Sequence, residues 1–111
     1  MISKQTEDKI LKFRDDRQWK QYHNGKDLAI SISLEANELL ECYQWSAEDL
    51  DVNKKIDNIK EELADTVIYC QMLADYYHLD LDKIINEKLI KNLEKYPQDK
   101  IINLKNKGNG I

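Results

Sequence analysis

Apolar residues recur at helical spacing along most of the chain. Four stretches of this kind predict α-helices, over residues 3–20, 27–44, 53–77 and from Asp80 or Asp82 to just before Pro97. The third stretch is apolar on nearly every side after its first turn, so we expect that helix to be central and largely buried. The pattern therefore predicts an all-α fold, a bundle of four helices.

The breaks between these helices are short and polar. Asn24-Gly25 is a strong turn signal, and a polar link follows Trp45. With 111 residues we expect a single domain over residues 1–111, with a tail from about residue 98 that is flexible. A bundle this small carries more apolar surface than one core needs, so we expect a homodimer or a dimer of dimers. The residues behind that expectation are Tyr43, Ile68, Met72 and Tyr76.

Composition narrows the class of protein. The mean hydropathy is -0.72, and no apolar run reaches the length of a membrane span, so we expect no membrane partner. The N-terminus lacks the pattern of a signal peptide, and Cys42 and Cys70 have no CxxC spacing, which predicts a cytoplasmic protein with reduced thiols. Residues 35–75 carry 11 acidic and 3 basic groups. Such a charge repels phosphate backbones, so a nucleic-acid partner is not expected.

Two pairs of carboxylates violate the helical pattern. Glu35 falls inside the apolar arc of the second helix and Glu38 borders it one turn on, while Glu62 and Asp65 lie one turn apart on the third helix. If these helices pack antiparallel, the pairs face each other and form a cage of oxygen ligands. Such a cage suits Mg²⁺, or Mn²⁺ as a substitute, and Mg²⁺ commonly binds substrate phosphates. The pattern predicts a nucleotide or another phosphoanhydride as substrate.

Other interpretations remain open at this point. Either acidic pair alone is more typical of a solvated helix face, and a non-catalytic helical interaction module would carry such pairs on its surface. A di-iron bundle requires Glu-x-x-His on two helices. That pattern fails, because His78 follows Asp75 at this spacing but His23 follows Lys20.

Three motifs, in order and at fitting spacing, resemble the MazG-like all-α nucleoside triphosphate pyrophosphohydrolases. They are Leu34-Glu35-Ala-Asn-Glu38-Leu-Leu-Glu41-x-x-Gln44-Trp45, then Glu61-Glu62-Leu-Ala-Asp65-Thr-Val-Ile-Tyr69, and finally Lys88-x-x-x-Asn92-x-x-Lys95-Tyr96-Pro97. The resemblance runs from about Trp19 to Pro97 and is greatest to the single-domain, dCTP-pyrophosphatase-like branch.

The resemblance implies hydrolysis of (deoxy)nucleoside triphosphates between the α and β phosphates, in nucleotide-pool house-cleaning. It places Mg²⁺ on Glu35, Glu38, Glu62 and Asp65. Glu38 is our candidate general base, and Glu35 is the second candidate catalytic residue. The implied substrate contacts are Trp19, His23, Lys26, Trp45, Tyr69, Lys88, Asn92 and Tyr96. The family often has proline where Gly25 stands. The same superfamily also hydrolyses phosphoribosyl-ATP, which is the alternative reaction.

Overall fold

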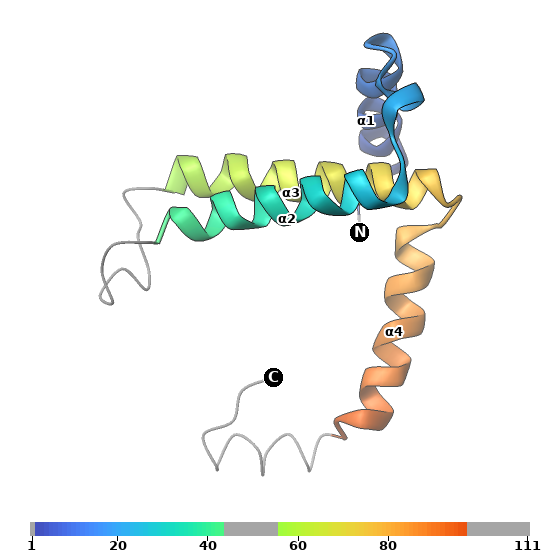
Figure 1. The fold of residues 1–111 in the computed structure, drawn as a ribbon. Helices are drawn as coiled ribbons and strands as arrows, with labels where there is room; N and C mark the ends of the chain where they lie inside the picture. The colour runs from blue at the N-terminus through green and yellow to red at the C-terminus, as the bar shows by residue number, and fades with distance from the viewer. Residues whose placement is uncertain (1, 44–55, 98–111) are drawn as a thin grey trace. The chain divides into compact units, whose positions relative to one another are not determined.

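The computed structural model describes residues 2–43 and 56–97. Every regular element in these two ranges is helical, which confirms the all-α prediction (Figure 1). The elements are α1 (Lys4–Asp16), the short 3-10 helix η1 (Trp19–Tyr22), α2 (Gly25–Glu41), α3 (Ile56–Tyr76) and α4 (Leu81–Lys95). The predicted polar link after Trp45, residues 53–55 of the predicted third helix and the predicted tail lie outside the described residues.

The first helix is shorter than the sequence pattern predicts. Ser3, one of two capping residues that the sequence offers beside Thr6, caps α1, because its hydroxyl oxygen accepts a hydrogen bond from the Thr6 amide at 3.1 Å. The helix ends at Asp16, however, and the prediction of one helix as far as Lys20 is wrong. Gln18 adopts the left-handed region, with φ 56°, so the backbone turns there and starts η1 at Trp19.

The second helix begins two residues earlier than predicted. Asn24 caps it, since its side-chain oxygen accepts a hydrogen bond from the Asp27 amide at 2.8 Å, and Gly25 is the first helical residue. A Cβ at Gly25 would collide with the side chain of Tyr77, which follows the end of α3. Glycine therefore allows the start of α2 to lie directly against the end of α3.

Helices α2 and α3 lie side by side and run in opposite directions, as predicted (Figure 1). The core holds one buried residue from each of α1, α2 and α3: Ile10, Leu28 and Met72. Ile2, Ile68, Tyr69 and Leu73 pack around these three. Burying apolar side chains from three helices in one cluster fixes α1 against the α2–α3 pair.

The expectation that the third helix is largely buried is wrong for the described residues. Only Gln71, Met72 and Ala74 of α3 are buried. Ile56, Leu63 and Tyr77 belong to its most apolar arc, yet they are 45%, 52% and 56% exposed. Met72 and half-buried Ile68, which we predicted on an oligomer surface, pack in the core of the single chain instead.

A second unit begins at Asp80 and contains α4. His78, with φ 56°, lies in the short connection between α3 and α4, and the Asp80 carboxylate accepts a hydrogen bond from the Lys83 amide at 3.3 Å. This capping contact confirms Asp80 as the residue that starts the last helix. The prediction of a single domain stays a prediction.

No helix in the described ranges combines the length and the apolar composition that crossing a bilayer requires.

Candidate functional site

The antiparallel pairing of α2 and α3 brings carboxylates of the two helices together. Glu35 of α2 and Glu62 and Asp65 of α3 each place one carboxylate oxygen within 4.8 Å of the other two. Glu62 and Asp65 are one turn apart, so they project side by side toward α2. We name these three residues the carboxylate cluster. Glu38, the fourth predicted ligand, is exposed and is not part of it, although its side chain interacts with Glu62.

The carboxylate cluster is a site that a cation would stabilise. One oxygen of Glu35, Oε2, and one of Glu62, Oε2, are buried without a hydrogen-bond partner among the described residues. A buried carboxylate oxygen without a partner is costly, and a divalent cation would remove that cost. Oxygen ligands alone are the set that hard cations prefer, so these residues fit Mg²⁺ or Mn²⁺.

The same crowding changes the acidity of the cluster. The pKa of Glu62 is raised to about 7, first by a hydrogen bond with Glu38, then by burial and by the charges of Glu38, Glu35 and Asp65. The pKa of Glu35 is also raised, first by burial and then by its interactions with Glu38. Like charges held this close favour the protonated forms, and a bound cation would favour the ionised ones.

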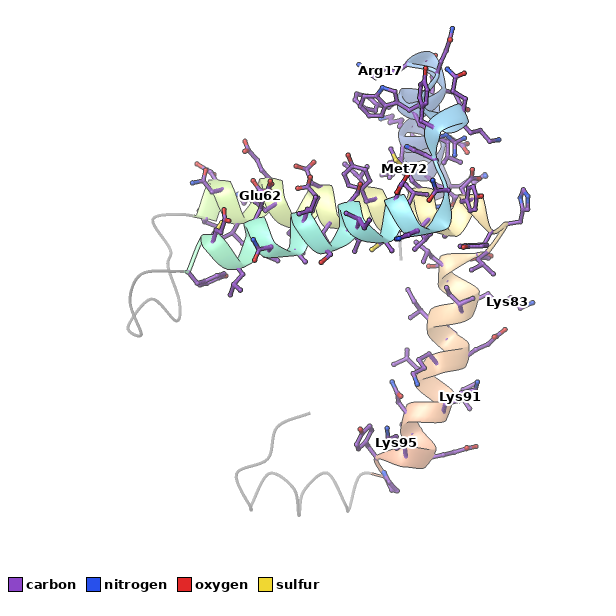
Figure 2. The ribbon with its side chains drawn as sticks, viewed as in Figure 1. Arg17, Glu62, Met72, Lys83, Lys91 and Lys95 are labelled. Atoms are coloured by element: carbon purple, nitrogen blue, oxygen red, sulfur yellow. The ribbon has the colours of Figure 1, made fainter. Side chains whose placement is uncertain are left out.

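A cavity of about 560 Å³ adjoins the carboxylate cluster. Its polar lining residues are Thr6, Lys9, Glu35 and Asp65, and the others are Ile10, Phe13, Trp19, Ile68, Tyr69 and Met72. Glu35 and Asp65, from α2 and α3, form what we call the carboxylate wall. Figure 2 shows Met72, which also lines the cavity, where α1 meets α3. One cavity therefore offers anionic oxygens and a large apolar surface to the same ligand.

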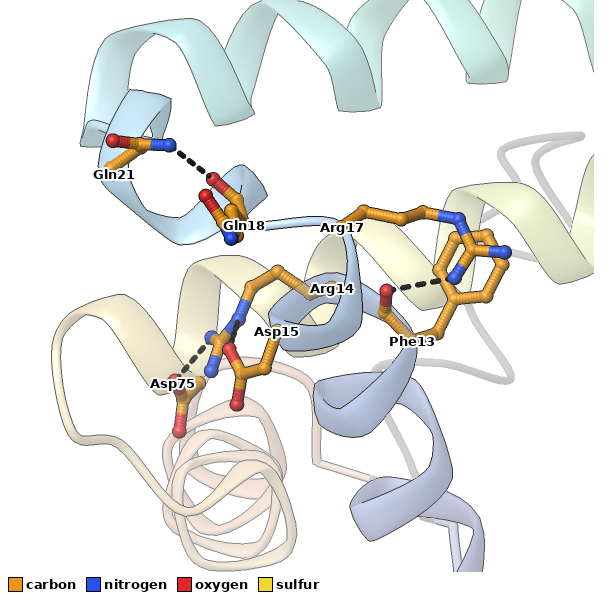
Figure 3. Close-up of polar contacts among 7 residues, drawn as sticks. All are labelled: Phe13, Arg14, Asp15, Arg17, Gln18, Gln21 and Asp75. Carbon is orange, nitrogen blue, oxygen red and sulfur yellow. Dashed lines mark hydrogen bonds and ion pairs between the residues drawn. The ribbon is translucent and has the colours of Figure 1, made fainter.

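Phe13 of α1 and Trp19 of η1 form the aromatic wall of this cavity. Their rings are 5.5 Å apart and nearly perpendicular, at 80°. The Arg17 guanidinium lies 3.5 Å from the centre of the Phe13 ring, and its Nη1 donates a hydrogen bond to the Phe13 carbonyl oxygen at 3.0 Å (Figure 3). The cation over the ring and the edge-to-face packing hold the aromatic wall in one orientation.

Not all predicted substrate contacts of the first unit reach the cavity. Trp19 and Tyr69 line it, while His23 and Lys26 are not among its described lining residues. His23 is half-buried, and its pKa is lowered, first by burial and then by the charge of Arg14. Lys26 is exposed in the first turn of α2. Trp45 lies outside the described residues.

Lys88, Asn92 and Tyr96 belong to the second unit, which we describe by itself. Lys88 and Asn92 line a shallow apolar groove on α4 together with Ile84, Ile85 and Leu89. Tyr96 follows the end of the helix, and its amide donates to the Asn92 carbonyl oxygen at 2.7 Å. The predicted common face thus holds for Lys88 and Asn92, and the contacts of all three with a substrate stay predictions.

The sequence reasoning missed six residues of the cavity lining. They are Thr6, Lys9, Ile10, Phe13, Ile68 and Met72. Spacing gave a signal for part of this set, because Thr6, Ile10 and Phe13 follow one another at four and three residues and so share a face of α1. The position of that face against α3 is a tertiary contact that spacing does not reveal.

The fold and the site together define an all-α protein with a carboxylate cluster beside a largely apolar cavity. Residues 30–111 match the model of the MazG-like family. The chain therefore belongs to the MazG-like family.

Curated relatives and a solved structure agree with this assignment. The chain is 32% identical over 91 residues to dCTP pyrophosphatase 1 of Rattus norvegicus and 29% identical over 90 residues to that of Homo sapiens. Each match covers 77% of this chain and 53% of the relative, so the chain spans about half the length of the curated relatives it matches. A pyrophosphatase from Archaeoglobus fulgidus aligns with a TM-score of 0.75 and 38% identity, over 82% of this chain and 88% of that one.

Proposed function

We propose that this chain hydrolyses (deoxy)nucleoside triphosphates between the α and β phosphates, giving a nucleoside monophosphate and pyrophosphate. The observation that carries the proposal is the cavity lined by the carboxylate wall and the aromatic wall. A metal-bound triphosphate fits beside the carboxylates, and a nucleobase fits against the aromatic rings. The curated relatives named dCTP pyrophosphatase support this choice of substrate class.

Glu35, Glu62 and Asp65 would hold Mg²⁺ or Mn²⁺, because their oxygens converge and two of those oxygens are buried without partners. When bound, the cation would neutralise triphosphate charge and lower the pKa of a coordinated water. We keep Glu38 as general base and as a further ligand, and its exposure and its interaction with Glu62 support this choice. Glu35, half-buried beside Glu62 and Asp65, is in this proposal a metal ligand and the second candidate catalytic residue.

The remaining predicted residues act on the substrate in this proposal. Trp19 and Tyr69, which line the cavity, hold the nucleobase. On the resemblance alone, we assign Trp45 to the nucleobase as well, and Lys88, Asn92 and Tyr96 to the phosphates and the sugar. His23 and Lys26 are further substrate contacts on the same ground. On the same resemblance we propose a role in nucleotide-pool house-cleaning.

Pyrophosphate release from a panel of nucleoside triphosphates, with Mg²⁺ or with EDTA, tests the proposal. We expect monophosphate and pyrophosphate in equal amounts, and no product with EDTA. Phosphoribosyl-ATP in the same panel tests the alternative reaction. Glu62→Gln removes an anionic ligand and should lose the proposed activity. Glu61→Gln is its matched control and should keep the activity, because Glu61 is the exposed neighbour on α3. Release of inorganic phosphate and a diphosphate, or no turnover on any substrate, would contradict the proposal.

We further propose that copies of this chain associate in the cytoplasm as a homodimer or a dimer of dimers, without nucleic acid or membrane. Exposed apolar residues of α2 and α3 support association: Ile30, Leu34, Leu40, Ile56 and Leu63. Light scattering at several protein concentrations checks the mass. A monomer at every concentration would contradict this part of the proposal.

A further inference from the structure

Arg14 is a charged residue in the interior of a small helical protein. It is 3% exposed, although most arginines lie at the surface. Its Nε donates a hydrogen bond to Asp15 Oδ1 at 2.8 Å, and its Nη1 donates to Asp75 Oδ2 at 2.5 Å (Figure 3). Neither Arg14 nor Asp75 has a part in the reaction proposed above. The burial of Arg14 against half-buried Asp75 therefore needs another explanation.

The ion pair joins two helices that both line the cavity. Arg14 is on α1, one turn after Ile10, and Asp75 is on α3, three residues after Met72. Ile10 and Met72 pack together in the core and also line the cavity. The Arg14–Asp75 contact thus lies one turn beyond the point where α1 and α3 meet beside the cavity.

Stability alone does not account for such a pair. Replacing a buried ion pair with apolar side chains of similar size is often neutral or stabilising, because burying two charges costs solvation. What an ion pair adds is direction, since a guanidinium donates along fixed N–H bonds whereas apolar contacts tolerate sliding. The packing of Ile10 buries α1 against α3, and the bond to Asp75 fixes how α1 is turned there.

We propose that Arg14 and Asp75 are positioning residues, which hold α1 in register on α3 and so set the aromatic wall for the nucleobase. This inference rests on the proposed function. Phe13 directly precedes Arg14, and Trp19 packs edge-on against Phe13. A shift of α1 therefore moves both rings relative to Glu35 and Asp65, which α2 and α3 hold independently of Arg14.

Steady-state kinetics with the full chain test the inference. Asp75→Leu leaves the buried Arg14 guanidinium with one of its two carboxylate partners and can impair folding, so the decisive variant is the double substitution Arg14→Met/Asp75→Leu. We expect it to fold, to raise KM at least about tenfold and to leave kcat within about twofold, because contacts made equally in the ground and transition states act on KM. Lys12→Met is the matched control. It removes an exposed ion pair with Asp16 on the same helix, and its KM should stay at the wild-type value.

Combination with Phe13→Ala separates positioning from general destabilisation. If Arg14 and Asp75 act through the aromatic wall, the KM increases of the double substitution and of Phe13→Ala will combine to much less than their product. Multiplicative effects, or a KM of the double variant within about twofold of wild type, would overturn the inference. Failure of the proposed function itself looks different, since the wild-type chain would then release no pyrophosphate from any triphosphate.

Discussion

Glu35 and Asp65 enter the cavity from α2 and α3, which run side by side, whereas Phe13 and Trp19 enter it from α1 and the turn that follows. The carboxylate wall depends on i and i+3 spacing within two helices and on their antiparallel pairing. The aromatic wall depends on the left-handed residue Gln18, on Arg17 and on the docking of α1. In the proposed function the first wall holds the metal and the second holds the base, so changes in the two walls should separate into effects on kcat and on KM.

The largest expected effect comes from breaking the carboxylate wall. Glu35→Gln and Asp65→Asn keep the size of the side chain but remove an anionic ligand, so we expect kcat to fall at least about 100-fold with normal folding. Pyrophosphate release with saturating Mg²⁺ measures the loss, and circular dichroism checks the fold. Wild-type activity in either variant would remove that residue from the metal site.

The next largest effect is a loss of stability on substitution in the hydrophobic core, two residues of which line the cavity. Leu28 is 1% exposed and packs with Ile10 and Met72, so Leu28→Ala should lower the free energy of unfolding by about 3 kcal/mol. Urea unfolding measures the change. Leu34→Ala, at a residue 60% exposed in the single chain, is the matched control and should cost far less. An equal cost at both residues would mean that a second chain covers Leu34.

Breaking the aromatic wall should affect binding more than chemistry. Trp19→Ala removes a ring of the cavity, and stacking of one base on a ring contributes about 1–3 kcal/mol, so KM should rise about tenfold or more with little change in kcat. Kinetics on two triphosphates with different bases measures it. Tyr22→Ala changes an aromatic of η1 that is 72% exposed, and it should leave KM unchanged. A fall in kcat alone for Trp19→Ala would contradict the distinction between the walls.

The smallest expected effect is a dependence of the melting temperature on pH, which arises in the carboxylate cluster. The pKa of Glu62 is raised from 4.5 to about 7 in the folded chain. Its protonated form thus stabilises the fold below its unfolded pKa, and this contribution is lost as the pH rises through about 7. In EDTA the melting temperature should therefore decline over that window. Mg²⁺ should raise it by a few degrees, and by more at about pH 8 than at about pH 5.5, because metal and proton compete for the same oxygens.

Glu62→Gln is the control for this pH dependence. It removes the titrating group, so the difference between the two pH values should shrink. The same Mg²⁺ shift at both pH values in the wild-type chain would show that the cation binds elsewhere.

Local rules were sufficient to predict the approximate positions of α1 to α4 and the acidic pairs. The caps at Ser3 and Asp80, the pairing of α2 with α3 and the convergence of Glu35, Glu62 and Asp65 all follow from spacing and binary pattern. The early end of α1 could not be predicted, because a left-handed Gln18 has no sequence signal comparable to glycine. The burial of Arg14 could not be predicted either, since its partner Asp75 is distant in the sequence.

The exposure of α3 shows a second limit. A helical wheel identifies the apolar arc with Ile56, Leu63 and Tyr77, but it does not say whether the same chain or another covers that arc. Met72 shows the opposite error, as a residue predicted for an oligomer surface lies in the core beside Ile10. Periodicity gives the face of a helix, and tertiary packing decides its neighbour.

In the proposed function one cavity holds the metal-bound triphosphate on its carboxylate wall and the base on its aromatic wall. The most direct test is a crystal structure with Mg²⁺ and a deoxynucleoside triphosphate whose α–β bridging oxygen is replaced by an imido group, so that the bond proposed to break stays intact. We predict cation density on Glu35, Glu62 and Asp65 and a base within stacking distance of Trp19. Nucleotide bound away from this cavity, or cation density on other residues, would contradict the account.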